Sequence, residues 1–178
     1  MKTIHTLKLM LTIVLTSIII ASCSKDESGP VNSTTSAKVG YHSAAIFDKG
    51  VSDAGLRQMQ VVMSNQNYNF YNSNSSASLN DTLLSVLFYS ELDNQVPSGI
   101  YKFSDTPDKG PFTFGNGMLY LQSSDYSGSL PVASIVSGSV NVSNKDSQYD
   151  ITFQCILSTG EKFRSEFHGG MTYIDAHQ

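Results

Sequence analysis

From residue 40 onward, apolar residues recur at every second position in short runs. In 148–158, for instance, Phe153, Cys155 and Leu157 alternate with neighbours that are mostly polar. Because successive side chains of a β-strand point to opposite faces, this spacing predicts strands with one buried face. The predicted strands are 41–47, 56–64, 82–91, 99–104, 117–124, 134–143, 148–158 and 161–175. Gly, Pro, Asn, Asp and Ser gather between them, as turns require.

This series of short strands predicts an all-β fold, with about eight antiparallel strands in a sandwich or a curled barrel. The last two runs are expected to form a hairpin, since Gly160 between them can take a positive φ. Gly169 and Gly170 interrupt the final strand and predict a bulge or a bend where the sheet curls. The alternation also places Cys155 in the core, as a small apolar side chain rather than a reactive thiol.

The N-terminal segment has a different layout. Lys2, His5 and Lys8 give it a positively charged start, and an apolar run follows over 9–21. That run is shorter than the about 20 apolar residues that cross a bilayer. The layout is typical of a cleaved export signal.

The apolar run ends in Ile20-Ala21-Ser22-Cys23, which resembles the lipobox of bacterial lipoproteins. In that family the cysteine thiol carries diacylglycerol and the chain is cut just before it. The resemblance implies that Cys23 is lipidated and that acyl chains hold the protein on a membrane.

The following residues, SKDES, resemble the signal that sends Bacteroidetes lipoproteins to the outer leaflet of the outer membrane. This resemblance implies a lipid-anchored protein of the outer membrane that is exposed at the cell surface, while the other reading of 24–38 is a solvated tether. The expected organisation is a lipoprotein signal peptide (1–22), a lipidated cysteine with a flexible tether (23–39) and a single all-β domain (40–178).

The charge and the cysteine content limit the classes of binding partner and the disulfides that we expect. The formal net charge of the chain is −4, and removal of Lys2 and Lys8 with the signal makes it two units more negative. An acidic protein of this kind is not expected to bind nucleic acid. With Cys23 acylated, Cys155 has no partner for an intramolecular disulfide.

The segments VPSGIYKFSD, FGNGMLYLQ and IVSGSVNVSNKDSQYDITFQ follow one another between residues 96 and 175, ahead of a final glycine-containing strand. This order resembles a recurrent module of Bacteroidetes lipoproteins of unassigned function, with a β-sandwich or a calycin-like barrel domain. The resemblance implies that Gly99 and Gly138 lie at turns or bulges. It implies core positions for Tyr101, Val140, Val142, Tyr149 and Ile151. It supplies no catalytic residue.

Catalytic and metal-binding motifs are not found. The sequence lacks the His-Glu-x-x-His zinc motif, the phosphate-binding Gly-rich Lys motif and the Gly-x-Ser-x-Gly nucleophile elbow. Arg164, Glu166 and His168 share one face of the last strand, which is interpreted as a solvated face rather than a metal or acid–base cluster. Asp105 and Asp108 are interpreted as part of a Pro/Gly turn rather than a Ca²⁺ loop. We therefore expect no enzyme, no cofactor and no metal.

The Asn- and Ser-rich segment 65–81 is the most unusual part of the chain after the signal. Its three aromatic residues, Tyr68, Phe70 and Tyr71, could stack on a sugar or a protein partner, or could pack back onto the sheet. The residues Asp81-Thr82-Leu83 resemble the Bacteroidetes O-glycosylation motif, which makes Thr82 a candidate acceptor.

Two classes of function remain open. The first is a non-enzymatic surface lipoprotein, an adhesion, glycan-contact or envelope-complex subunit that presents loops to a glycan or an envelope protein. The alternative is a lipocalin-like binder of a small apolar ligand in a barrel cavity. Exposed aromatic residues on one loop favour the first, and an empty interior favours the second.

Overall fold

The computed structural model describes residues 37–70, 81–91, 94–106, 109–122 and 129–176. All of these lie in one compact unit, Thr35–Gln178. Its ten strands are β1 (Ala37–Tyr41), β2 (Ser43–Val51), β3 (Arg57–Ser64), β4 (Thr82–Ser90), β5 (Gly99–Phe103), β6 (Thr113–Gln122), β7 (Ser129–Lys145), β8 (Gln148–Leu157), β9 (Lys162–Gly170) and β10 (Thr172–Asp175). The described residues contain no helix, so the all-β prediction is confirmed. β1 begins inside the segment 23–39 that was expected to be a tether.

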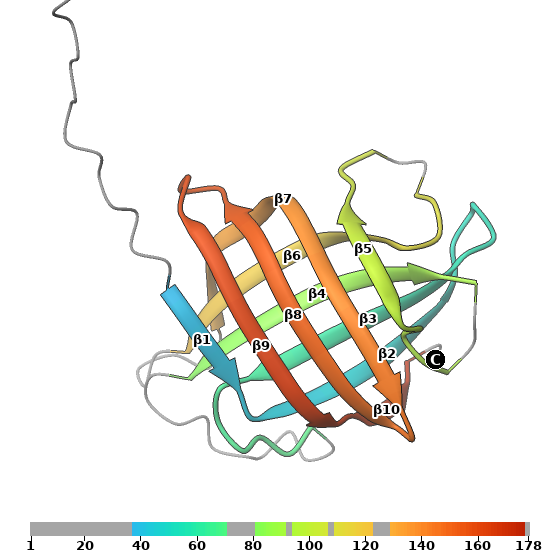
Figure 1. Cartoon of the computed structure of the whole chain (residues 1–178), viewed down its shortest axis with the longest axis horizontal. Coiled ribbons are helices and arrows are strands. Elements are labelled where there is room, and N and C mark those ends of the chain that lie inside the picture. Colours follow the sequence, from blue (N-terminus) through green and yellow to red (C-terminus); the bar gives the residue numbers. More distant parts are fainter. Residues whose placement is uncertain (1–36, 71–80, 92–93, 107–108, 123–128, 177–178) are drawn as a thin grey trace, which may run out of the picture. The chain divides into compact units, whose positions relative to one another are not determined.

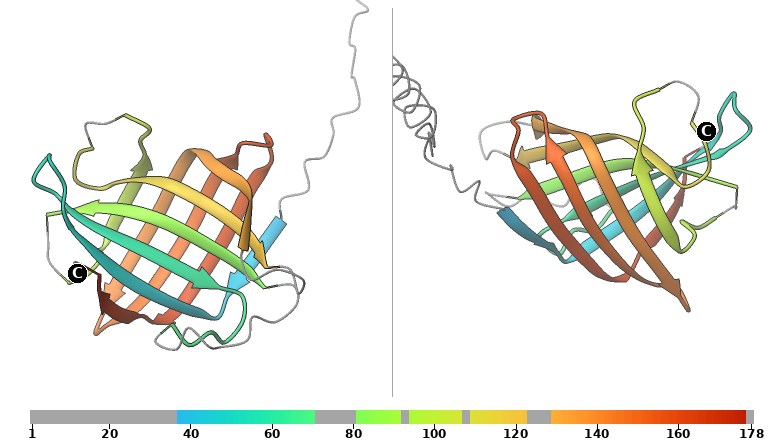
Figure 2. Two further views of the ribbon diagram at one scale, coloured as in Figure 1. Left: turned by 180° about the vertical axis from the view of Figure 1, so that it is seen from behind. Right: turned by 45° about the horizontal axis from the view of Figure 1, so that its top comes forward.

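All ten strands belong to one sheet, in the order β1-β9-β8-β7-β5-β6-β4-β3-β2-β10. The sheet curls, so that β7, β8 and β9 form one layer and β2, β3, β4 and β6 form a second layer that runs obliquely behind it (Figure 1). The view from behind shows the same two layers in reverse (Figure 2). The curled form predicted from the sequence is therefore the one observed.

The two edges of the sheet are joined by the chain itself. β1 and β2 are separated only by His42, yet β1 pairs in parallel with β9 at one end of the strand order, and β2 pairs in parallel with β10 at the other. β9 and β10 are likewise separated only by Met171. Two segments predicted as single strands are therefore each divided. The second division follows Gly169, which has φ +150°, so the predicted interruption at this glycine pair is confirmed.

β5 is inserted between two strands that pair with each other further along. It runs antiparallel to β7 and parallel to β6, whereas 118–122 of β6 pair directly with 129–134 of β7. The register of β7 against β8 shifts between Ile135 and Ser137, next to Gly138. Gly138 has φ +129°, and an added Cβ would lie 2.6 Å from Cα of Cys155. The predicted bulge at Gly138 is confirmed, and only glycine fits it.

The core lies between the two layers and is filled by large side chains. The largest that are fully buried are Tyr101, Phe88, Phe114, Phe153, Phe163, Met59, Met63, Leu84, Ile151, Val61, Val86 and Val96. The hairpin of β8 and β9 shows the predicted alternation, with φ +84° at Gly160 in its turn. Cys155 is 4% exposed, and burial raises the pKa of its thiol to about 11, which confirms the core assignment. The other predicted core positions, Tyr101, Val140, Val142, Tyr149 and Ile151, are also buried.

Candidate functional site

The segment that follows β3 folds back onto β2. The hydroxyl of Ser43 donates to the carbonyl oxygen of Gln66 at 2.7 Å, and the backbone N–H of Tyr68 donates to the same hydroxyl at 3.0 Å. One serine on β2 therefore fixes the backbone of this segment on both sides of Asn67. This anchoring determines where the following aromatic side chains lie.

Three rings meet beside β2, and we call Phe47, Tyr68 and Phe70 the aromatic patch. The ring centroids of Tyr68 and Phe70 are 4.9 Å apart, and Phe70 meets Phe47 nearly edge-on at 6.4 Å. Nζ of Lys49 lies 6.0 Å from the centroid of Phe47. All three rings are half-buried, so the patch is accessible but also packed.

The structure therefore brings together two of the three aromatic residues that the sequence singled out. The third, Tyr71, lies outside the described residues. Sequence reasoning missed Phe47 and Lys49, although a signal was present: they occupy the outward positions of a strand whose inward positions hold Ile46 and Asp48. Rings of this kind with a neighbouring cation can contact sugar rings or apolar side chains.

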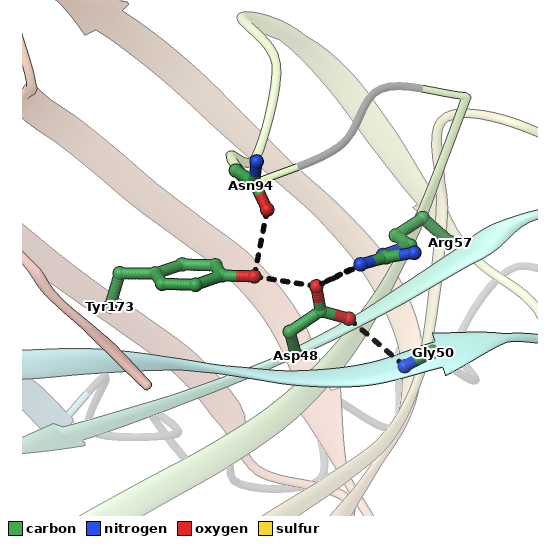
Figure 3. Close-up of polar contacts among 5 residues, drawn as sticks. All are labelled: Asp48, Gly50, Arg57, Asn94 and Tyr173. Carbon is green, nitrogen blue, oxygen red and sulfur yellow. Dashed lines mark hydrogen bonds and ion pairs between the residues drawn. The ribbon is translucent and has the colours of Figure 1, made fainter. Parts of the chain in front are cut away.

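Inside the sheet, β2 carries a second group of polar contacts, the Asp48 cluster (Figure 3). Oδ2 of Asp48 accepts hydrogen bonds from Nη2 of Arg57 at 2.5 Å, from Nε of Arg57 at 3.0 Å and from the phenol of Tyr173 at 2.6 Å. Oδ1 accepts from the backbone N–H of Gly50 at 2.9 Å. The side-chain amide of Asn94 lies 2.8 Å from the Tyr173 oxygen. β2, β3 and β10 are thereby joined at one carboxylate, and the segment before β5 is joined to them through the Tyr173 oxygen.

The electrostatics of Asp48 point to a structural role. Its side chain is fully buried, and burial alone would raise the pKa of the carboxyl group. The hydrogen bonds from Arg57, Tyr173 and Gly50 and the charge of Arg57 outweigh burial and lower the pKa to about 2. Burial and the adjacent carboxylate raise the pKa of Tyr173. A carboxylate that is held ionised by four donors is a weak proton acceptor, so the cluster is suited to holding strands together rather than to acid–base chemistry.

The predicted glycosylation motif lies at the start of β4. The N–H of Thr82 donates to the side-chain oxygen of Asn65 at 2.8 Å, and the carboxylate of Asp81 accepts from the hydroxyl of Ser64 at 2.7 Å. Asp81 is 1% exposed and Thr82 is half-buried. The motif is therefore bound into the fold at the end of the β3–β4 pair, and glycosylation of Thr82 stays a prediction.

The polar face of β9 is exposed as predicted. Arg164, Glu166 and His168 point to solvent, Glu166 pairs with Lys38 at 2.8 Å, and His168 pairs with Asp150. Among the described residues, no three of His, Cys, Asp and Glu are grouped as a metal site would require.

Two further predicted residues lie at or beyond the limits of what the structure describes. Asp105 is exposed after β5, whereas Asp108 lies outside the described residues, as does Cys23. Within the described ranges, no helix has the length and apolar character of a membrane span.

Comparison with known proteins gives no relative: no family model, no curated protein sequence and no solved structure matches the chain.

Proposed function

We propose that the chain is a non-enzymatic, lipid-anchored lipoprotein of the outer membrane that uses the aromatic patch to contact a glycan or an envelope protein at the cell surface. The observation that carries the proposal is the position of Tyr68 and Phe70. The bonds to Ser43 fix the backbone that carries them, Phe70 packs against Phe47 and Tyr68 packs against Phe70. Both residues keep part of their surface in solvent. Such rings provide contact area at a small cost in conformational entropy.

The alternative, a lipocalin-like binder, has less support. A ligand of that kind would occupy the space between the two layers of the sheet. Twelve large side chains that are less than 2% exposed occupy the interior instead, among them Tyr101, Phe88 and Phe114. Binding inside the sheet would require these side chains to move.

Anchoring is tested with Cys23→Ala. Because the acyl chains on Cys23 are the proposed attachment, the variant should move from the detergent phase to the aqueous phase in a phase partition of whole cells. Added protease should also remove the unmodified protein from intact cells if it lies on the outer leaflet. An unchanged detergent-phase partition of Cys23→Ala would contradict the anchor.

The contact surface is tested with Tyr68→Ser and Phe70→Ser combined in one variant. We expect loss of binding to a glycan array or to cell-envelope fractions. The control is Val136→Ser on β7, because Val136 is an apolar surface residue outside the aromatic patch, 46% exposed. If the thermal midpoint of the double variant falls by several degrees, about 1 kcal/mol or more for a domain of this size, the rings are core residues. Unchanged binding by a folded double variant would remove the patch from consideration.

A further inference from the structure

A separate hollow of about 200 Å³ lies at the end of β4, beside β5. Its walls are mainly apolar and come from Ser90, Glu91, Pro97, Tyr101 and Phe112, which we call the end pocket. None of these residues belongs to the aromatic patch or to the Asp48 cluster. The end pocket therefore goes beyond the proposed function.

Phe112 forms one wall in an unusual conformation. Its φ is +55°, which is rare for a residue with a bulky side chain, and the residue remains 44% exposed. The backbone is held there from both sides, since its N–H donates to Tyr89 O at 3.2 Å and its carbonyl accepts from Lys102 N at 3.0 Å. The surrounding strands thus hold the ring at the surface, although a ring that stays partly exposed adds little hydrophobic stabilisation to the fold. Strained residues of this kind gather at ligand sites.

Two neighbours complete the fit around the ring. An added Cβ at Gly99 would lie 2.6 Å from Cε1 of Phe112, so the ring occupies the space that a side chain at position 99 would need. The ring of Tyr101 lies 5.3 Å from that of Phe112, at an angle of 53°. The phenol of Tyr101 donates to the carbonyl oxygen of Pro97 at 2.9 Å, which fixes a third wall. The pocket is therefore preformed.

Size and charge indicate the ligand. An apolar cavity of about 150 Å³ accepts a benzene molecule, whereas pockets for drug-sized ligands begin at about 300 Å³. The end pocket thus has room for one ring. Glu91 is exposed beside it, and no ion pair to its carboxylate is found in the described part of the chain. A carboxylate next to aromatic faces favours a cation. We propose that the end pocket binds a ring-sized apolar group that carries a positively charged amine.

The test is a titration of the full-length protein with 2-phenylethylammonium at pH 7, followed by amide NMR shifts. We expect saturable shifts at Glu91, Tyr101 and Phe112. Phe112→Gly should weaken binding at least tenfold, and it should fold, since glycine accepts φ +55° readily. Gly99→Ala gives a second variant that displaces the same ring without removing it, and Val136→Ser is the control that should bind normally.

Two further probes, one neutral and one negatively charged, test whether the charge of Glu91 contributes to binding. Glu91→Gln should weaken binding of 2-phenylethylammonium about tenfold and leave binding of 2-phenylethanol unchanged. The unmodified protein should bind 3-phenylpropionate more weakly than it binds the amine or the alcohol. Equal affinity for the amine, the alcohol and the carboxylate would overturn the charge preference. Absence of shifts at the three pocket residues, or equal affinity in Phe112→Gly, Gly99→Ala and the unmodified protein, would overturn the site itself.

Discussion

Among the carboxylates of the sheet that pair with basic side chains, Asp48 and Asp150 lie at opposite depths. Asp48 and Arg57 have side-chain exposures of 0% and 20%, whereas Asp150 and His168 have exposures of 65% and 79%. The first pair also binds a phenol and a backbone N–H, and the second spans neighbouring positions of the β8–β9 hairpin. Both pairs join a carboxylate to a basic side chain, in different surroundings.

The difference lies in what surrounds each charge. Water and salt screen the exposed pair, so its attraction is small and its loss leaves no uncompensated group. The carboxylate of Asp48 is fully buried and has lost its hydration, so removal of Arg57 leaves a buried negative charge without its cation. Depth therefore decides which pair the fold depends on. The variants below test that conclusion.

Arg57→Met should have the largest effect. It leaves the buried carboxylate of Asp48 without its cation, which costs about 3–5 kcal/mol for pairs of this kind. The measurement is the free energy of unfolding in urea. A combined Asp48→Leu and Arg57→Met variant is the control and should recover much of the loss, because neither charge remains. If Arg57→Met lowers the free energy of unfolding by less than about 1 kcal/mol, the buried pair contributes no more than the exposed pair of Asp150 and His168.

Acid should destabilise the protein through Asp48. Its pKa is lowered to about 2 in the folded state, so the carboxylate contributes stability above the unfolded pKa of about 4, and that contribution is lost as the pH falls toward 2. The shift corresponds to about 2 kcal/mol. The difference in unfolding free energy between the unmodified protein and Asp48→Asn should therefore be large at pH 7 and small at pH 2. Parallel curves for the two proteins would contradict the lowered pKa.

Tyr173→Phe should have an intermediate effect. It keeps the ring but removes the hydroxyl that donates to Asp48, at a cost of about 1.5 kcal/mol for a hydrogen bond to a charged group. Because Tyr173 lies on β10, amide hydrogen exchange should rise first in β10 and in the facing residues of β2. Unchanged protection of β10 would show that the bond does not hold the sheet at this edge.

Asp150→Asn should have the smallest effect. The pair with His168 is exposed and screened, so we expect a loss of no more than about 1 kcal/mol, and less in 1 M NaCl. Denaturation in low and high salt measures both quantities. A salt-independent loss above about 2 kcal/mol would show that exposure does not set the value of these pairs.

The fold was predictable where the information is local. Alternation along 148–158, and Gly160 at the following turn, are properties of neighbouring residues, and both predictions were correct. The Asp48 cluster was not found, because the predicted strand 41–47 stopped one residue before Asp48. The strand in fact continues to Val51, and the next inward position after Ile46 is acidic. The third member, Tyr173, lies 125 residues away along the chain, so no local pattern could place it there.

The parallel pairing of β1 with β9 and of β2 with β10 has a consequence for how the molecule is made. The only neighbour of β1 in the sheet is β9, so β1 stays unpaired until β9 has been synthesised. β2 can pair with β3 at once, but its second neighbour, β10, comes later still. Such distant contacts slow folding, because a long loop must close, at a cost in entropy, before the contacts can stabilise the fold. Until then β1, and the edge of β2 that later pairs with β10, present unpaired backbone groups to other chains. Premature termination before β9 should therefore produce an aggregating species rather than a smaller stable domain.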